Sequence, residues 1–207
     1  AQGVARLVEN GGRMRLLVGA QLDPEDLAAI EAGHSLESQV ARRLLAELEH
    51  LEEELVRRRL EVLAWMIGAG TLQIKVVLPT GPDGRVLPAH LAQDYYHPKA
   101  GIFTDAWGDQ VAFNGSINET VQGWQRNYEQ FAVYRSWDES RPYLLQEVYR
   151  FQRLWEGKEP YWVALPIPRA VQERLLTLRP SQPIYRDPLE EEQILPPKAA
   201  EAKKEYG

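Results

Sequence analysis

Polar side chains of the kinds used in phosphoryl transfer are concentrated in one stretch of the sequence, residues 96–137. The set consists of His97, Lys99, Gly115, Ser116, Asn118 and Glu129. Alternate residues of an extended segment share a face, so we expect His97 and Lys99 to point the same way. The turn residues at 107–109 predict a hairpin of strands 98–104 and 110–114, which would bring the Gly-Ser-x-Asn segment back beside them. A nucleophile or general base, a fixed cation and an amide donor would then converge on one spot.

That combination of side chains suits a phosphoryl group. A lysine and an asparagine stabilise charge on the non-bridging oxygens, and a histidine can attack phosphorus to form a covalent intermediate. Glu129, on a following strand, would accept a hydrogen bond from the second ring nitrogen of His97 and hold its tautomer. This scheme requires no metal and no other cofactor. Asp94, His97 and Asp105 match no standard metal-ligand spacing, and His90 lacks polar companions of this kind.

The order and spacing of these residues is that of a known signature. The motifs are His97-x-Lys99, then Gly115-Ser116-x-Asn118, then Asn127-x-Glu129. They resemble the HKD signature of the phospholipase D superfamily, and their context resembles the phospholipase D-like nuclease modules that precede helicase-like ATPases in restriction and phage-defence proteins. A chance match of both leading motifs at this distance is on the order of one in a thousand at ordinary residue frequencies.

The resemblance implies an α/β sandwich in which two HKD motifs form one active site. This chain holds one motif, so a homodimer is implied. His97 of one protomer would become phosphorylated, while the partner's His97 would protonate the leaving oxygen and later activate water. Lys99, Asn118 and Gly115 would bind the phosphate group, and Ser116 would form a hydrogen bond near the two histidines. Glu129 would orient the imidazole.

The sequence departs from the family pattern in two places. The family's aspartate commonly stands where this chain has Thr104, and Asp105 comes one residue later, which favours a role in structural support for Asp105. Members also begin with a strand and a glycine-containing loop that would precede Ala1. We therefore expect an N-terminally truncated fragment of a longer polypeptide, with the first strand missing and with poor activity.

Local patterns predict an α/β fold with a mixed β-sheet flanked by helices on both faces. We expect one domain over residues 1–178 and a Pro- and Glu-rich linker or tail over 179–207. The long charged pattern over 36–67 is interpreted as a surface helix packed on its own sheet, with a partner-binding coiled coil as the alternative. The predicted helices cover 2–9, 23–32, 36–67, 118–123, 138–157 and 169–178, and the predicted strands cover 14–18, 72–78, 98–104, 110–114, 129–135 and 161–165, the last at a sheet edge.

The composition of the chain excludes several classes of protein and of site. The net charge of −6 excludes a basic nucleic-acid-coating surface as a global property, although a local basic cleft is compatible with it. The sequence has no apolar run long enough for a membrane span and no secretory signal at its start. Because cysteine is absent, disulfides, thiol nucleophiles and cysteine zinc sites are excluded. A cytoplasmic location is expected.

These observations favour a metal-independent phosphodiesterase that acts on DNA and is joined to a helicase-like ATPase domain. The choice of DNA rests on the resemblance and not on the charge of the chain. The alternative is a non-catalytic module that uses the same fold to dimerise and to hold DNA. Hydrolysis of lipid headgroups is disfavoured, because the sequence shows no interfacial apolar helix or membrane anchor.

Overall fold

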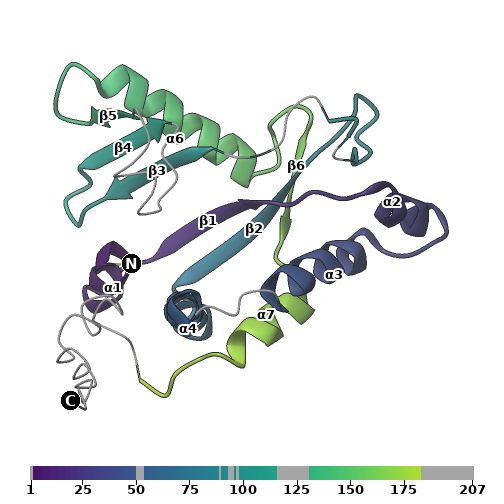
Figure 1. The fold of residues 1–207 in the computed structure, drawn as a ribbon. Coiled ribbons are helices and arrows are strands. Elements are labelled where there is room, and N and C mark those ends of the chain that lie inside the picture. Colours follow the sequence, from purple (N-terminus) through teal and green to yellow (C-terminus); the bar gives the residue numbers. More distant parts are fainter. Residues whose placement is uncertain are drawn as a thin grey trace, which may run out of the picture. The chain divides into compact units, whose positions relative to one another are not determined.

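The computed structural model describes residues 2–49, 54–88, 90–92, 96, 98–115 and 131–182 (Figure 1). Its contacts divide the chain into two compact units, one of Ala1–Leu16, Ala41–Gln73 and Ile167–Gly207 and the other of Leu17–Val40 and Ile74–Pro166. The helices are α1 (Gln2–Glu9), α2 (Pro24–Glu31), α3 (Leu36–Glu49), α4 (Glu54–Gly68), α6 (Arg141–Trp155) and α7 (Arg169–Leu176). The strands are β1 (Met14–Gly19), β2 (Leu72–Pro79), β3 (Lys99–Thr104), β4 (Gln110–Gly115), β5 (Phe131–Arg135) and β6 (Trp162–Pro166).

The described strands form two three-stranded sheets, ordered β1-β2-β6 and β3-β4-β5. The α/β class is confirmed, but the strands are divided between two sheets where one mixed sheet was predicted. In the first sheet β6 pairs antiparallel with β2 and lies at the edge, as predicted. The second sheet is an antiparallel meander of consecutive strands. The predicted helix over 118–123 and the predicted tail from residue 183 onward lie outside the described residues.

The first unit is built from helices. Ala41, Val171 and Leu175 form its buried apolar cluster, which joins α3 to α7. The predicted pattern over 36–67 corresponds to α3 and α4, and the four residues between these helices lie outside the described ones. The partly buried side chains packed against the cluster are Leu44, Leu45, Leu48, Leu60, Ile67 and Ile167. The apolar stripe of the pattern therefore packs on another helix, α7, where a sheet was predicted as its partner. Within the described ranges, no helix is long and apolar enough to cross a membrane.

In the second unit, α6 packs along the β3-β4-β5 sheet (Figure 1). Leu144 and Leu154 of this helix are buried. Tyr143 is 57% exposed, although its ring stacks on Tyr134 of β5 with the centroids 5.6 Å apart. Ser140 is the N-cap residue, but its side chain caps no amide of the helix.

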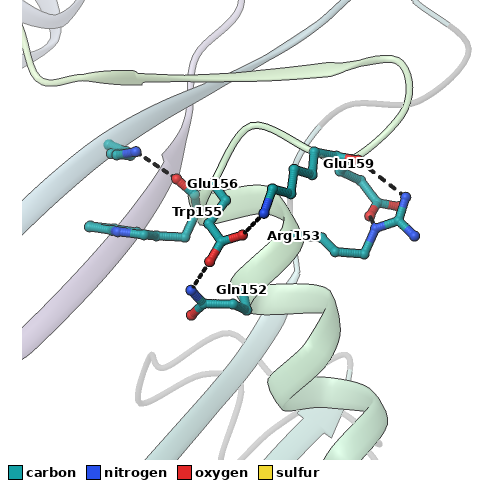
Figure 2. A network of polar contacts seen from close by, with 7 residues as sticks. Gln152, Arg153, Trp155, Glu156 and Glu159 are labelled. Carbon is teal, nitrogen blue, oxygen red and sulfur yellow. Dashed lines mark hydrogen bonds and ion pairs between the residues drawn. The ribbon is translucent and has the colours of Figure 1, made fainter.

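A polar network fixes the C-terminal end of α6 to β2 (Figure 2). Lys75 Nζ of β2 donates to the carbonyl oxygen of Trp155 at 2.6 Å and lies 5.0 Å from the centre of the indole ring. The lysine charge is thus held by both a backbone dipole and an aromatic face. The other contacts of the network are Arg153 with Glu159 at 2.8 Å, Lys158 with Glu156 at 2.5 Å, and Gln152 with Glu156.

Candidate active site

The β3–β4 hairpin places Lys99 directly opposite Gly115. Its register runs from this pair to Thr104 opposite Gln110, so the predicted hairpin is confirmed. Lys99 is half-buried at the first position of β3, and Gly115 is the last residue of β4. The structure therefore brings these two predicted site residues together. The other predicted members of the site, His97, Ser116, Asn118 and Glu129, lie outside the described residues.

Asp105 lies at the other end of the hairpin, in the turn between β3 and β4. One of its carboxylate oxygens accepts hydrogen bonds from the backbone amides of Trp107 and Asp109, each at 2.9 Å. Gly108, in the same turn, has a φ of +91°, a conformation that favours glycine. Asp105 is six residue steps from Lys99 along the extended chain, which corresponds to about 20 Å. The Asp105 carboxylate thus holds the turn and lies far from Lys99.

Side-chain alternation divides the β3-β4-β5 sheet into two faces. One face is covered by α6, as the complete burial of Ala112 and the contact of Tyr134 with Tyr143 show. We call the opposite one the Lys99 face. Its positions in the described strands are Lys99, Gly101, Phe103, Val111, Phe113, Gly115, Phe131, Val133 and Arg135. Lys99 therefore belongs to the side of the sheet that α6 does not cover.

An aromatic pair lies on the Lys99 face. The rings of Phe103 and Phe113 stack with their centroids 5.9 Å apart and an interplanar angle of 25°. Gly101, the cross-strand partner of Phe113, makes room for this arrangement, since a Cβ atom at position 101 would lie 2.4 Å from Cε1 of Phe113. The ring of Phe113 thus covers the bare backbone of Gly101 and extends toward Phe103.

Glu147 of α6 holds the strand end that precedes Gly115. Its Oε1 accepts a hydrogen bond of 2.7 Å from Nδ2 of Asn114, and this pair is partly buried. A charged acceptor makes the bond stronger than one between two neutral groups. Asn114 directly precedes the Gly115-Ser116-x-Asn118 motif, but nothing local in the sequence connects it with a glutamate 33 residues later. Sequence reasoning therefore missed Glu147 as a positioning residue.

Tyr96, the residue before His97, is fixed by two contacts. Its backbone carbonyl approaches Gly19 so closely that a Cβ atom on that glycine would lie 2.3 Å from the oxygen. Its ring meets Trp162 of β6 edge to face, with centroids 6.0 Å apart. Burial raises the pKa of Tyr96 to about 12, and the charge of Arg150 opposes this effect. The phenol is therefore neutral at physiological pH, and the backbone that leads to His97 is anchored against β1 and β6.

Among the described residues, no three His, Asp or Glu side chains are grouped so that they could hold a metal ion. Carboxylates of the hairpin turn and of α6 have other partners: Asp105 accepts from the turn amides, Asp109 from Ser136 Oγ, and Glu147 from Asn114. The described part of the predicted site thus contributes the cation of Lys99 and the backbone at Gly115. No protein-family model, curated protein or solved structure matches this chain.

Proposed function

We propose that this chain is a metal-independent phosphodiesterase of the phospholipase D-like class that cleaves DNA through a phosphohistidine on His97. The observation that carries the proposal is the pairing of Lys99 with Gly115. His97 precedes Lys99 by two residues, and Ser116 follows Gly115 directly. The described members of the two motifs, Lys99 and Gly115, lie side by side at one end of the hairpin, and this supports the proposal.

The proposal extends to the fold and the assembly. It includes a phospholipase D-like sandwich, a cytoplasmic location and an active site shared by two copies of the chain, because one copy holds one motif. It also includes a helicase-like ATPase domain on the same polypeptide. The HKD-like spacing of the motifs supports these points.

The proposed reaction has two displacements at phosphorus. A ring nitrogen of His97 attacks the phosphorus of a DNA phosphodiester, a P–N bond forms, and the P–O bond to the leaving strand breaks. The partner's His97 donates a proton to the leaving oxygen. It then takes a proton from water, whose oxygen attacks the phosphohistidine. The P–N bond breaks, so a phosphomonoester is released and both imidazoles return to their starting states.

The remaining residues bind and orient in this scheme. Lys99 and Asn118 would stabilise the negative charge on the non-bridging oxygens, and the backbone at Gly115 would approach the phosphate without hindrance from a side chain. Ser116 would donate a hydrogen bond next to the histidines. Glu129 would fix the imidazole tautomer. The hydrogen bond between Glu147 and Asn114 supports this arrangement, because it holds the backbone from which Gly115 and Ser116 continue.

Cleavage of DNA in excess chelator tests the proposal. We expect hydrolysis of DNA and of bis(p-nitrophenyl) phosphate without added metal, and a loss of at least about 10³-fold in kcat for His97→Ala. His90→Ala is the matched control, because His90 is an exposed histidine of the same region and no step uses it. Lys99→Met should lower kcat by roughly 10²-fold or more. Activity that requires a metal, or that survives His97→Ala, would exclude the mechanism.

Trapping of the intermediate separates the proposal from the non-catalytic alternative. Acid-labile and base-stable phosphate on His97 after a rapid quench is expected if the chain is an enzyme. Tight binding of DNA, with neither hydrolysis nor a trapped phosphohistidine, would support the module that only dimerises and binds. Sedimentation across a concentration range should show a dimer in either case.

A further inference from the structure

The Lys99 face carries exposed apolar side chains. Phe103 is 63% exposed and Val133, on the neighbouring β5–β4 ladder, is 42% exposed. Phe113 lies between them in the sheet and stacks on Phe103. Contiguous apolar surface of this kind often marks a place where another molecule binds. The rings are also prearranged, since Gly101 leaves the space that Phe113 occupies.

The charges on the Lys99 face have one sign. Lys99 lies at one end of β3 and Arg135 at the far corner, on β5, and no strand position of this face in the described strands is acidic. Arg135 forms an ion pair of 3.4 Å with Asp138, yet its side chain stays 53% exposed. An aromatic surface bordered by cations complements a strand of phosphodiesters, whose bases stack and whose phosphates are anionic.

We infer that the Lys99 face binds single-stranded nucleic acid, with bases stacked on Phe103 and Phe113. Phe103 is four residues from Lys99 along β3, or about 13 Å. A strand whose phosphate lies at Lys99 would thus extend over the aromatic pair. The inference deepens the proposed function and rests on it for the scissile phosphate at Lys99. The stacking surface and its cations do not depend on the cleavage chemistry.

A second copy of the chain suits this face less well. An isologous dimer through it would place two cation-bordered surfaces together, with no acidic strand position on either side to receive Lys99 or Arg135. Nucleic acid supplies both the anionic groups and the flat rings. We therefore assign the face to nucleic acid and leave self-association as an outcome of the test.

The test measures binding of a labelled oligothymidylate of roughly 15 nucleotides by fluorescence anisotropy. Every protein in this assay carries His97→Ala, so that no strand is cut. Adding Phe103→Ala should weaken binding about 5- to 100-fold, because each base stacked on an aromatic ring contributes that much. Phe103→Trp should bind as well or better, and Phe103→Leu should behave like alanine. Tyr149→Ala is the matched control, because Tyr149 is equally exposed at 63% but belongs to α6, which packs against the other face.

Hydrolysis of bis(p-nitrophenyl) phosphate, measured with His97 intact, separates this inference from the proposed function. The small diester does not extend from Lys99 to the aromatic pair, so its kcat reports on the cleavage chemistry alone, whereas the oligonucleotide affinity reports on the Lys99 face. Unchanged oligonucleotide affinity in Phe103→Ala overturns the inference even if hydrolysis proceeds. Dimer dissociation caused by Phe103→Ala overturns it in favour of a second copy. Affinity that depends on Phe103, without hydrolysis in any variant, supports the binding face and refutes the phosphodiesterase.

Discussion

Replacing Gly19 by alanine is expected to disturb the chain just ahead of the HxK motif. The new Cβ would lie 2.3 Å from the carbonyl oxygen of Tyr96, whereas real Cβ atoms essentially never come within 3.0 Å of a neighbour. The backbone at Tyr96 must therefore retreat by about 0.7 Å or more. One peptide bond joins Tyr96 to His97, so the displacement would reach the proposed nucleophile.

The expected magnitudes follow from this crowding. Overpacking of this kind destabilises a protein by about 1–3 kcal/mol, because the obstacle is backbone and not a flexible side chain. For a chain of this size the midpoint of thermal unfolding should fall by about 2–12 °C. A misplacement of nearly 1 Å should reduce kcat on bis(p-nitrophenyl) phosphate by roughly 10- to 100-fold.

Gly68→Ala provides the matched control. Its Cβ would also meet a close neighbour, at 2.7 Å, but that neighbour is the side chain of Arg179, which can rotate away. Calorimetry and steady-state kinetics of both variants decide the matter. Equal melting temperatures for Gly19→Ala, Gly68→Ala and the parent protein would refute the close approach of β1 to Tyr96.

Three further predictions concern Tyr96, Lys75 and Asp105. Burial raises the pKa of Tyr96 in the folded protein to about 12, so its stabilising effect is complete below the unfolded pKa of about 10 and is lost as pH rises through about 12. Denaturant titrations should show that the free energy of unfolding falls by about 1–2 kcal/mol across that window, a value discounted for the partial exposure of the side chain. Tyr96→Phe should abolish this pH dependence. Lys75→Met should lower the free energy of unfolding by about 1.5–3 kcal/mol, because it leaves the Trp155 carbonyl without its charged donor. Lys158→Met is the control: it removes an exposed ion pair and should change the free energy of unfolding by less than about 1 kcal/mol. Asp105→Ala should reduce the free energy of unfolding by about 1–2 kcal/mol and leave kcat unchanged, because the carboxylate accepts hydrogen bonds from two turn amides. A loss of activity without a loss of stability would instead assign Asp105 to the chemistry.

Elements whose signals are local could be predicted from the sequence. Asp23 caps α2 and forms a reciprocal capping box with Asp26, and Gly33 ends that helix with a φ of +101°. The β3–β4 hairpin is equally local, because Asp105 and Gly108 provide the turn between two apolar strands. In each case a few neighbouring residues determine the backbone, and these residues can be read in order.

Contacts between distant segments could not be predicted in the same way. The approach of Gly19 to Tyr96 joins residues that no periodicity relates, and the bond between Asn114 and Glu147 crosses from a strand to a helix. Strand periodicity identifies the faces of each strand but not its neighbours, so one sheet was predicted where the described strands form two. Tyr161, a non-glycine residue with a φ of +65° before β6, gave no signal of its conformation.

The pairing of Lys99 with Gly115 constrains how the length of this chain can vary during evolution. Because successive strand residues point to opposite sides, one residue inserted between Lys99 and Thr104 would move Lys99 to the side under α6, where Ala112 is fully buried. The same insertion within residues 105–109 would only enlarge an exposed turn. Relatives that keep this lysine are thus expected to tolerate insertions and deletions in the turn, while the strand tolerates only substitutions.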